Sequence, residues 1–305
     1  MTEDVVLGRD DLPVVYRAAS DESRAGQERF QRGNRWGLFL LVGAAAAGLG
    51  SIHVQVQTHL FDVLGIVAAV CFFAAIILRL FQLVSHPDKV WYDGRIVAES
   101  TKTLAWRYAV GGEPFSLALS PKLADELLGQ RLHEILTDIE HLELEPAMKN
   151  ARQITERMRQ LRGAALSVRR ASYAKGRIED QRGWYAYRAK QNKRSARRWN
   201  AFLILVEVVG AGEAVLKATG ILPIDLLGVI GTVAAAAVSW VQAKQFQALA
   251  QTYALASHEL TSIGDRLAHQ DTEPEWPLFV NDAEEAISRE HTLWRASRSE
   301  SRLPI

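Results

Sequence analysis

Cysteine is nearly absent from this sequence, and so is any apolar segment near its start. The one cysteine in 305 residues, Cys71, has no partner for an internal disulfide, so nothing places the bulk of the chain in an oxidising compartment. Cys71 lies in the apolar run 70–73, where we expect a small buried hydrophobic side chain rather than a reactive thiol. Residues 1–30 are polar, so they predict no signal peptide.

The sequence also lacks an excess of either charge sign and lacks the short motifs of enzymes. Its 36 Lys and Arg residues nearly balance 35 Asp and Glu residues, for a formal net charge of +1. Nucleic-acid binding usually needs a basic excess, so we expect no nucleic-acid partner. No Gly-rich phosphate loop, no nucleophile beside a base and no metal-spaced Cys/His cluster is present. We therefore expect no enzyme, no catalytic residue, no cofactor and no metal.

Charge is almost missing from four long apolar stretches. Residues 36–52, 63–78 and 226–241 contain no Asp, Glu, Lys or Arg, and residues 201–216 contain two glutamates. A helix needs roughly 17–25 residues to cross a bilayer. With the interfacial residues at their ends, the stretches predict four membrane spans. These spans cover about 36–52, 60–81, 200–217 and 222–242.

Basic residues gather on one side of the predicted spans. They lie before the first, after the second, before the third and after the fourth: Arg24, Arg29, Arg32, Arg35, Arg79, Lys89, Arg95, Arg188, Lys190, Lys193, Arg194, Arg197, Arg198 and Lys244. The connection 51–62 contains no Lys or Arg, and the connection 217–225 contains only Lys217. Because cytoplasmic loops collect Lys and Arg, we expect both termini and the segment between the two span pairs to be cytoplasmic.

The two span pairs look like copies of one unit. Trp36 and Trp199 each open a pair with a similar apolar run, and Asp62 and Asp225 each precede the second span of their pair. The separation from tryptophan to aspartate is the same in both pairs. A repeat of this kind indicates duplication, with both copies starting from the same side of the membrane. The hairpins therefore form a parallel repeat, unlike the inverted repeats of many transporters.

The remaining chain predicts helices only. Runs of alternating polarity long enough for strands are missing, so the expected fold class is all-α, a polytopic membrane protein with long cytoplasmic helices. Expected helices cover 90–108, about 121–142, 147–200 continuing into the third span, the stretch after the fourth span to about 270, and 282–298, with a loop at 272–277. We expect two domains, 14–145 and 146–298, with one hairpin in each.

Two segments outside the spans resemble a known family. Residues 91–108, WYDGRIVAESTKTLAWRY, resemble the signature that follows the hairpin in one SLATT subfamily. Residues 177–185, RIEDQRGWY, followed by AKQN at 189–192, resemble the helix that leads into the hairpin of a second SLATT subfamily. The resemblance spans about 14–298, and the tandem order is familiar for the family. SLATT domains are two-transmembrane effector modules of bacterial conflict systems, associated with nucleotide-synthesising and nucleotide-sensing proteins.

This resemblance implies a membrane effector. Its expected activity is that of a homo-oligomer that perturbs the inner (plasma) membrane, as a pore or channel, when a partner signals infection. The expected partners are the lipid bilayer, further copies of the chain and a nucleotide-sensing protein. Two other functions stay open on the same residues: a constitutive ion channel without a defence role, and a membrane-anchored scaffold whose cytoplasmic helices recruit partners.

Four acidic residues in or beside the spans are candidate pore residues. Glu207 and Glu213 lie inside the third span, where a carboxylate costs about 2.5–3.5 kcal/mol on insertion scales. They either line an ion path or bond to neighbouring helices, and Glu213 alternatively reaches the outer interface near Lys217. Asp62 and Asp225 either cap the spans that follow them or form an outer ring that attracts cations.

A second group of candidates forms an expected cytoplasmic interface. Charges of both signs and aromatic side chains alternate there, which is typical of interface cores, although a solvated or ion-paired face would carry the same charges. As a docking surface it would receive a sensor protein or a second copy of the chain. Its members are Trp91, Tyr92, Arg95, Glu99, Lys102, Trp106, Arg107, Arg177, Asp180, Gln181, Trp184 and Tyr185.

Overall fold

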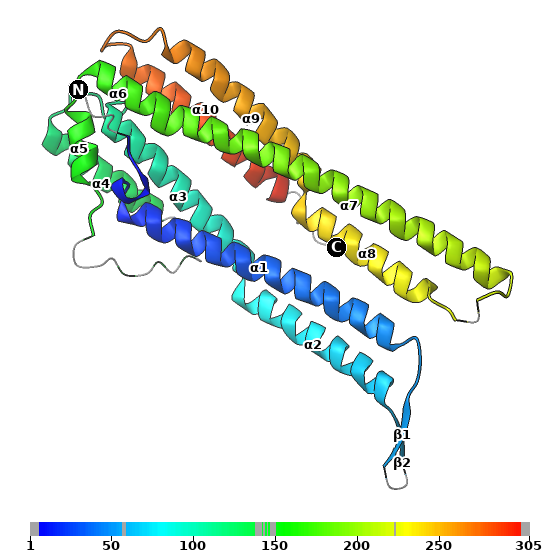
Figure 1. Ribbon diagram of the computed structural model, residues 1–305. Helices are drawn as coiled ribbons and strands as arrows, with labels where there is room; N and C mark the ends of the chain where they lie inside the picture. Colours follow the sequence, from blue (N-terminus) through cyan, green and yellow to red (C-terminus); the bar gives the residue numbers. More distant parts are fainter. Residues whose placement is uncertain are drawn as a thin grey trace. The chain divides into compact units, whose positions relative to one another are not determined.

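Helices dominate the computed structural model, which describes residues 6–56, 59–137, 142, 144, 146, 151–222 and 224–299 (Figure 1). The elements in chain order are η1 (Arg9–Asp11), α1 (Val14–Ala47), β1 (His53–Val56), β2 (His59–Asp62), α2 (Val63–Ser85), α3 (Pro87–Val110), α4 (Pro121–Thr137), α5 (Glu156–Arg162), α6 (Leu166–Tyr173), the π-helical segment η2 (Ala174–Glu179), α7 (Asp180–Ala218), α8 (Leu227–Lys244), α9 (Phe246–Leu267) and α10 (Trp276–Ser299).

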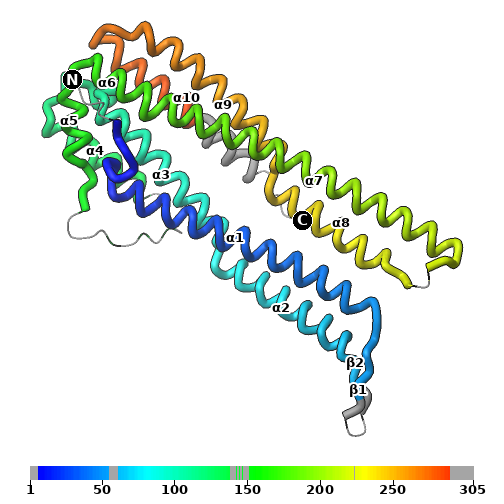
Figure 2. Tube along the Cα trace, viewed as in Figure 1, coloured from blue at the N-terminus to red at the C-terminus, as the bar shows by residue number. Residues whose placement is uncertain are grey.

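The chain divides into two compact units, and each unit combines early and late segments of the sequence (Figure 2). The hairpin unit consists of Gln27–Pro87 and Lys190–Ala250, and so contains most of α1, α2, most of α7 and α8. The α3 unit consists of Met1–Gly26, Asp88–Ala189 and Gln251–Ile305. Each unit therefore holds parts of both predicted repeats.

In the hairpin unit, α1 and α2 run antiparallel and lie in contact along the length of α2. Just after α1 ends, a Cβ placed on Gly50 would lie 3.6 Å from Cδ1 of Leu64, at the start of α2, and a Cβ placed on Gly43 of α1 would lie 3.7 Å from Sγ of Cys71. Near the other end of α2, the Gln82 side chain occupies the space that a side chain at Gly33 would need. Small residues in α1 thus let the two helix backbones approach closely, as is common between helices in lipid.

Apolar side chains cover the surfaces of α2 and α8. Two helical stretches, Val63–Val110 and Leu227–Leu267, are long and apolar enough to cross a membrane by length and composition. Within their most apolar windows, 0% of the first and 6% of the second is buried. Contiguous exposed apolar surface of this kind marks a membrane or protein interaction site, because a soluble monomer rarely exposes so much of it.

In the α3 unit, α3 is the central helix. No residue from 88 to 112 is exposed. Val97 packs with Val15 and Ala19 of α1, and Trp106 packs edge-on against Tyr173 with ring centroids 5.9 Å apart. Because α3 is covered on all sides, its charged side chains need partners inside the unit.

The expected all-α class is confirmed, and two short strands, β1 and β2, lie in the connection between α1 and α2, where the sequence predicted no strand. β1 and β2 pair antiparallel, with Val54 opposite Phe61. Asp62 Oδ1 accepts the Ile52 N–H at 3.1 Å at the base of the hairpin. Each strand has four residues, too few for alternating polarity to show in the sequence.

The long helix expected from residue 147 is also wrong in its first part. Thr155 caps a separate helix, α5, by accepting the Met158 N–H at 3.3 Å, and α5 ends at its C-cap Gly163. Helical structure resumes at Leu166 and continues through the π segment into α7. Residues 147–150 lie outside the described residues.

Two other helix ends differ from expectation. α10 begins at Trp276 rather than at residue 282. Pro277 falls in its first turn, where a helix does not use the backbone N–H group that proline lacks. α4 ends at Thr137, and Leu142 is not helical, while residues 138–141 lie outside the described residues. The expected helices around α3 and α9 are confirmed within a few residues.

Candidate functional site

The candidate site is built around the π-helical segment before α7. A π turn holds one extra residue and so re-aims the side chains around it, and such turns are frequent at functional sites. Gly176 makes the turn possible against Trp106, since a Cβ there would come within 2.8 Å of the indole ring. The turn brings Arg177 into the interior of the α3 unit, where it is 1% exposed.

Arg177 and Glu284 form an ion pair that is buried on all sides. Arg177 Nε donates to Glu284 Oε1 at 2.9 Å, and Arg177 Nη2 donates to Glu284 Oε2 at 2.7 Å. Tyr173 and Thr103 hydroxyls also donate to this carboxylate, each at 2.9 Å. Four hydrogen bonds to one carboxylate, two of them from a cation, replace the water that burial removes from Glu284. Among the described residues, Arg177 Nη1 is buried without a hydrogen-bond partner.

Burial and mutual attraction set the charge states of this group. Burial by itself would lower the pKa of Arg177, but the carboxylate of Glu284 outweighs it, and the pKa lies above its ordinary value. Burial, followed by the charge of Glu284, raises the pKa of Tyr173 well above its ordinary value. Arg177 is therefore charged and Tyr173 neutral at physiological pH.

Lys102 of α3 lies beside the pair. Its Nζ donates to Gln181 Oε1 of α7 at 3.3 Å. Burial, followed by repulsion from Arg177, lowers the pKa of Lys102, while Glu99 and Asp180 oppose that shift. A second cation next to Arg177 therefore links α3 to the start of α7 at an electrostatic cost.

Two buried arginines hold the C-terminal end of α3. Arg162 Nη1 donates to the carbonyl groups of Tyr108 at 3.1 Å and Phe115 at 2.5 Å. Arg169 Nη1 donates to the carbonyl of Val110, the last residue of α3, at 2.7 Å. The last carbonyl groups of a helix lack partners and carry partial negative charge, which suits cations. Burial lowers the pKa of both arginines.

The Arg177–Glu284 cluster, defined as Arg177, Glu284, Thr103 and Tyr173, connects four elements. Thr103 comes from α3, Tyr173 and Arg177 from α6 and the π segment, and Glu284 from α10. Its carboxylate oxygens are occupied by internal donors, so the arrangement acts as a support that fixes these elements relative to one another. Across the described ranges, no group of three or more His, Cys, Asp or Glu is arranged to hold a metal ion.

Comparison with known families assigns the two sides of this cluster to two matched segments. The sequence model of the SMODS and SLOG-associating 2TM effector domain 3 matches residues 13–170, and that of the SMODS and SLOG-associating 2TM effector domain 1 matches residues 173–294. The chain belongs to the SLATT family. The resemblance of the two signature segments is thereby confirmed. No curated protein and no solved structure matches the chain.

The two SLATT domains lie in tandem and meet in the α3 unit. Thr103 belongs to the first SLATT domain, whereas Arg177 and Glu284 belong to the second. The domain boundary expected at 145–146 stays a prediction, and the first matched segment extends to residue 170. As 2TM effector domains with two candidate spans, α2 and α8, the SLATT domains associate the chain with a membrane.

The tandem SLATT chain turns most of the expected cytoplasmic interface inward. Trp91, Trp106, Arg177, Gln181 and Tyr185 are buried, and Tyr92, Arg95, Glu99, Lys102 and Arg107 are half-buried. Asp180 and Trp184 are exposed. Within one chain, the covered residues form contacts between the SLATT domains, since α3 is enclosed by its own neighbours. Of the residues expected to form a docking surface, only Asp180 and Trp184 are exposed to a partner.

Asp62 and Asp225 lie at the start of the second helix of each hairpin. Asp62 Oδ1 accepts the Leu64 N–H at 3.1 Å, and Asp225 Oδ1 accepts the Leu227 N–H at 3.2 Å. Asp62 is the N-cap residue of α2, so its contact is N-terminal capping. The N-cap residue of α8 is Leu226, and Asp225 bonds to the first turn from one position before it. Asp225 also forms an ion pair with Lys217 across the connection of its SLATT hairpin.

The two glutamates of α7 have different surroundings. Glu213 is 5% exposed and accepts the Leu226 N–H at 3.0 Å, so it bonds to the start of the neighbouring helix. Glu207 is exposed on the surface of the hairpin unit. Of the candidate pore residues of the second SLATT hairpin, Glu213 therefore lies beside Asp225 at the start of α8, whereas Glu207 lies on the exposed surface.

Sequence reasoning missed the partners of Arg177. Thr103, Tyr173 and Glu284 carry no motif of their own. One signal was present for Glu284, because it continues the helical spacing of the buried residues Val280 and Ile287 and thus lies on the apolar face of α10. A carboxylate in such a position needs a buried donor.

Proposed function

We propose that the chain is a non-enzymatic membrane effector of a prokaryotic conflict system that assembles into a homo-oligomer and opens a pore or channel. The effector role is supported by both matched domains, which are described as SMODS and SLOG-associating 2TM effector domains. The pore rests on one observation, the exposure of Glu207 within an apolar part of α7.

The proposal uses four spans, two in each hairpin. α2 and α8 belong to the stretches that are apolar enough to cross a membrane. α1 lies against α2 from Gly33 to Gly43, and α7 meets α8 where Glu213 accepts the Leu226 N–H. A helix that lies beside a span shares its depth in the bilayer. We therefore expect α1 and α7 to cross together with α2 and α8.

Glu207 is the polar residue that this arrangement must accommodate. Its neighbours Leu205 and Val208 are apolar, and they are 58% and 62% exposed. A carboxylate that faces lipid at this depth costs about 2.5–3.5 kcal/mol. Unlike Glu213, Glu207 does not lie buried against the neighbouring helix. Contact with water or with a second copy of the chain would remove that cost, and an oligomeric pore supplies both.

The orientation follows from the basic flanks of the spans. Both termini and the segment 87–189 are placed in the cytoplasm, because Lys and Arg concentrate there. β1, β2 and the connection 217–225 then face outward. In this orientation a nucleotide-sensing protein in the cytoplasm reaches the segment between the hairpins.

Depolarisation of bacteria that express the chain tests the pore. The wild-type chain should depolarise cells loaded with a potential-sensitive dye, and Glu207→Gln or Glu207→Leu should do so several-fold less at equal membrane insertion. Glu179→Gln removes an exposed carboxylate of the α3 unit and should leave depolarisation unchanged. Full depolarisation by Glu207→Leu would count against an ion path along this residue.

Purified chain in liposomes separates the remaining functions. Ion flux without any trigger would favour a constitutive channel. A strictly monomeric chain would contradict both channel functions, because two hairpins are too few to enclose a water path. Retention of function after both hairpins are exchanged for unrelated anchors would favour a scaffold.

A further inference from the structure

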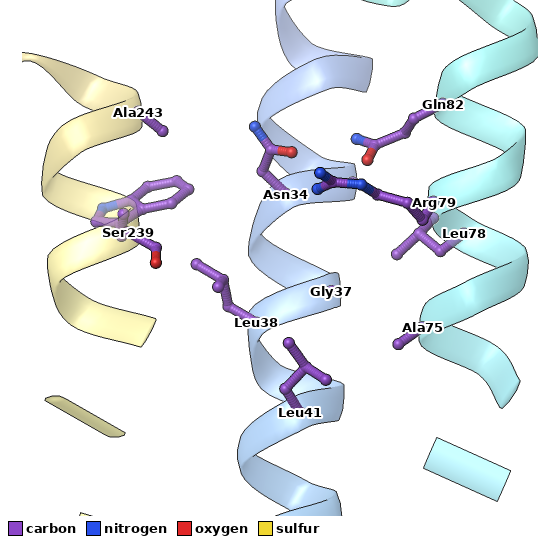
Figure 3. Close-up of a pocket in the computed structure, with 12 residues that line it drawn as sticks. Asn34, Gly37, Leu38, Leu41, Ala75, Leu78, Arg79, Gln82, Ser239 and Ala243 are labelled. Atoms are coloured by element: carbon purple, nitrogen blue, oxygen red, sulfur yellow. The ribbon is translucent and has the colours of Figure 1, made fainter. Parts of the chain in front are cut away.

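The hairpin unit contains a cavity of about 260 Å³ between α1, α2 and α8 (Figure 3). One water molecule needs only about 15 Å³, so this space holds a larger group. α1 and α2 belong to the first SLATT domain and α8 to the second. An occupant of the cavity would therefore touch both hairpins.

The lining of the cavity changes from polar to apolar along the helices. Asn34 of α1 and Arg79 of α2 lie at one end, with Ser239 of α8 on the opposite wall (Figure 3). Leu41 lies about two turns further along α1, and Ala75 about one turn from Arg79 along α2. A polar end that continues into an apolar wall matches a phospholipid, in which a phosphate is joined to hydrocarbon.

Arg79 gives the polar end its charge. Among the described residues that line the cavity, Arg79 is the only charged one. Its side chain is exposed, and among the described residues its guanidinium group has no hydrogen-bond or ion-pair partner. A guanidinium donates two parallel N–H groups to a phosphate with good geometry. The cavity thus presents an uncompensated cation next to hydrocarbon.

We propose that this cavity binds one anionic phospholipid, with its phosphate on Arg79 and part of an acyl chain against Leu38, Leu41 and Leu78. The bilayer is the source, because α2, which carries Arg79, is apolar enough to cross it, and anionic headgroups attract basic residues at the membrane surface. The lipid bridges the hairpins of the two SLATT domains. This binding goes beyond the pore and does not depend on it.

Gly37 offers a way to fill the cavity without disturbing its walls. It lines the cavity, and a Cβ added there would have no heavy atom within 4 Å. Gly37→Leu would occupy the space of the acyl chain, and leucine also favours a helix. Gly231 of α8 has equally open surroundings but is not part of the lining, so Gly231→Leu is a matched control.

Native mass spectrometry of the full chain in detergent, titrated with phosphatidylglycerol, phosphatidylcholine or inorganic phosphate, tests the proposal. One phosphatidylglycerol should stay bound per wild-type chain. Arg79→Gln should weaken its binding at least about tenfold, as expected for the loss of a charge-assisted hydrogen bond. Gly37→Leu should abolish the adduct. Gly231→Leu and Arg35→Gln, which removes an exposed cation of α1 outside the lining, should retain it.

Three results would overturn the proposal. An adduct that persists in Gly37→Leu would place the lipid elsewhere on the surface. Equal retention of phosphatidylcholine and phosphatidylglycerol would remove the role of net charge. Inorganic phosphate that binds as tightly as phosphatidylglycerol would make this a small-anion site. If Gly37→Leu does not fold, the comparison of Arg79→Gln with Arg35→Gln decides alone.

Discussion

Arg177 and Glu284 place two opposite charges in the interior of a helical unit. Removing them from water costs several kcal/mol per ion, so the pair is tolerated only when hydrogen bonds replace the lost hydration. The Glu284 carboxylate accepts from Arg177, Tyr173 and Thr103. We infer that the pair specifies how α10 and the π segment fit against α3, more than it adds net stability.

Removal of one partner of this pair should be far more damaging than removal of a surface pair. Glu284→Gln or Arg177→Gln leaves a buried charge uncompensated, so the free energy of unfolding should fall by about 3–5 kcal/mol. Arg131→Gln breaks an exposed ion pair with Glu134 and should change the free energy of unfolding very little. Chemical unfolding in detergent measures all three variants, and similar losses in all of them would contradict a special role for the buried pair.

Lys102 should make stability depend on pH in a defined direction. Burial, followed by the charge of Arg177, lowers its folded-state pKa below the unfolded value of about 10.4. The unfolded chain then holds the proton more strongly, so stability rises as pH climbs from the lowered pKa toward about 10.4. Lys102→Met should be more stable than the wild type at neutral pH, and its advantage should shrink with rising pH.

Unfolding temperatures of Lys102→Met and the wild-type chain, measured from about pH 7 to about pH 10, test this dependence. A difference that stays constant over that range would show that Lys102 does not change its charge there.

Helix α3 approaches α1 so closely in the α3 unit that one of its positions requires glycine. A Cβ on Gly94 would lie 2.9 Å from the carbonyl oxygen of Ala19 and 2.9 Å from the backbone N of Ser23. Both neighbours are backbone atoms, which have no rotamer to move away. Ser23 Oγ donates to the Trp91 carbonyl at 2.9 Å, which holds the helices together at this point.

Replacing two different glycines of the α3 unit by alanine should change the stability of the chain in opposite directions. Gly94→Ala forces α1 and α3 apart and should cost about 1–3 kcal/mol of unfolding free energy. Gly183→Ala in α7 meets no atom within 4 Å and should gain up to about 1 kcal/mol from helix propensity. Thermal unfolding in one detergent compares them. If both substitutions changed the unfolding temperature in the same direction, the approach of α1 to α3 would not be tight.

Across the full chain, the two SLATT domains share one interior. α3 comes from the first domain, and the π segment and α10 come from the second. Trp106 and Tyr173, one from each domain, are 1% and 0% exposed and pack against each other. Separation of the domains would expose both rings, so neither domain should be stable alone.

Fragments 1–145 and 146–305 should therefore fold only together. Each fragment expressed alone should aggregate or be degraded, whereas co-expressed fragments should purify together through a tag on one of them. Trp106→Ala should weaken this association strongly, because it removes a large buried side chain. Leu117→Ala, at a residue 44% exposed, is the control. A stable, folded fragment 1–145 would contradict a shared interior.

Residue order alone was enough to predict the helical class, the apolar spans α2 and α8 and the SLATT family. These properties are local, since an uncharged run of sufficient length has few places to lie except a membrane. The helix around α3 was predictable because helix-breaking residues on both sides of it are also a local signal, and it was expected at 90–108 and found at Pro87–Val110. The short strands β1 and β2 were not, because four residues carry too little periodicity.

Tertiary structure decided which charges are buried and which surfaces are free. Arg177 and Glu284 lie 107 residues apart in the sequence, and no local pattern around either residue identifies the other as its partner. The signature residues of the SLATT domains resembled an exposed interface until α3 proved to be enclosed. Glu207 and Glu213 lie in the same apolar run, yet only Glu213 is buried against α8. Burial of a charge depends on which distant segment packs over it, and that is a property of the assembled fold.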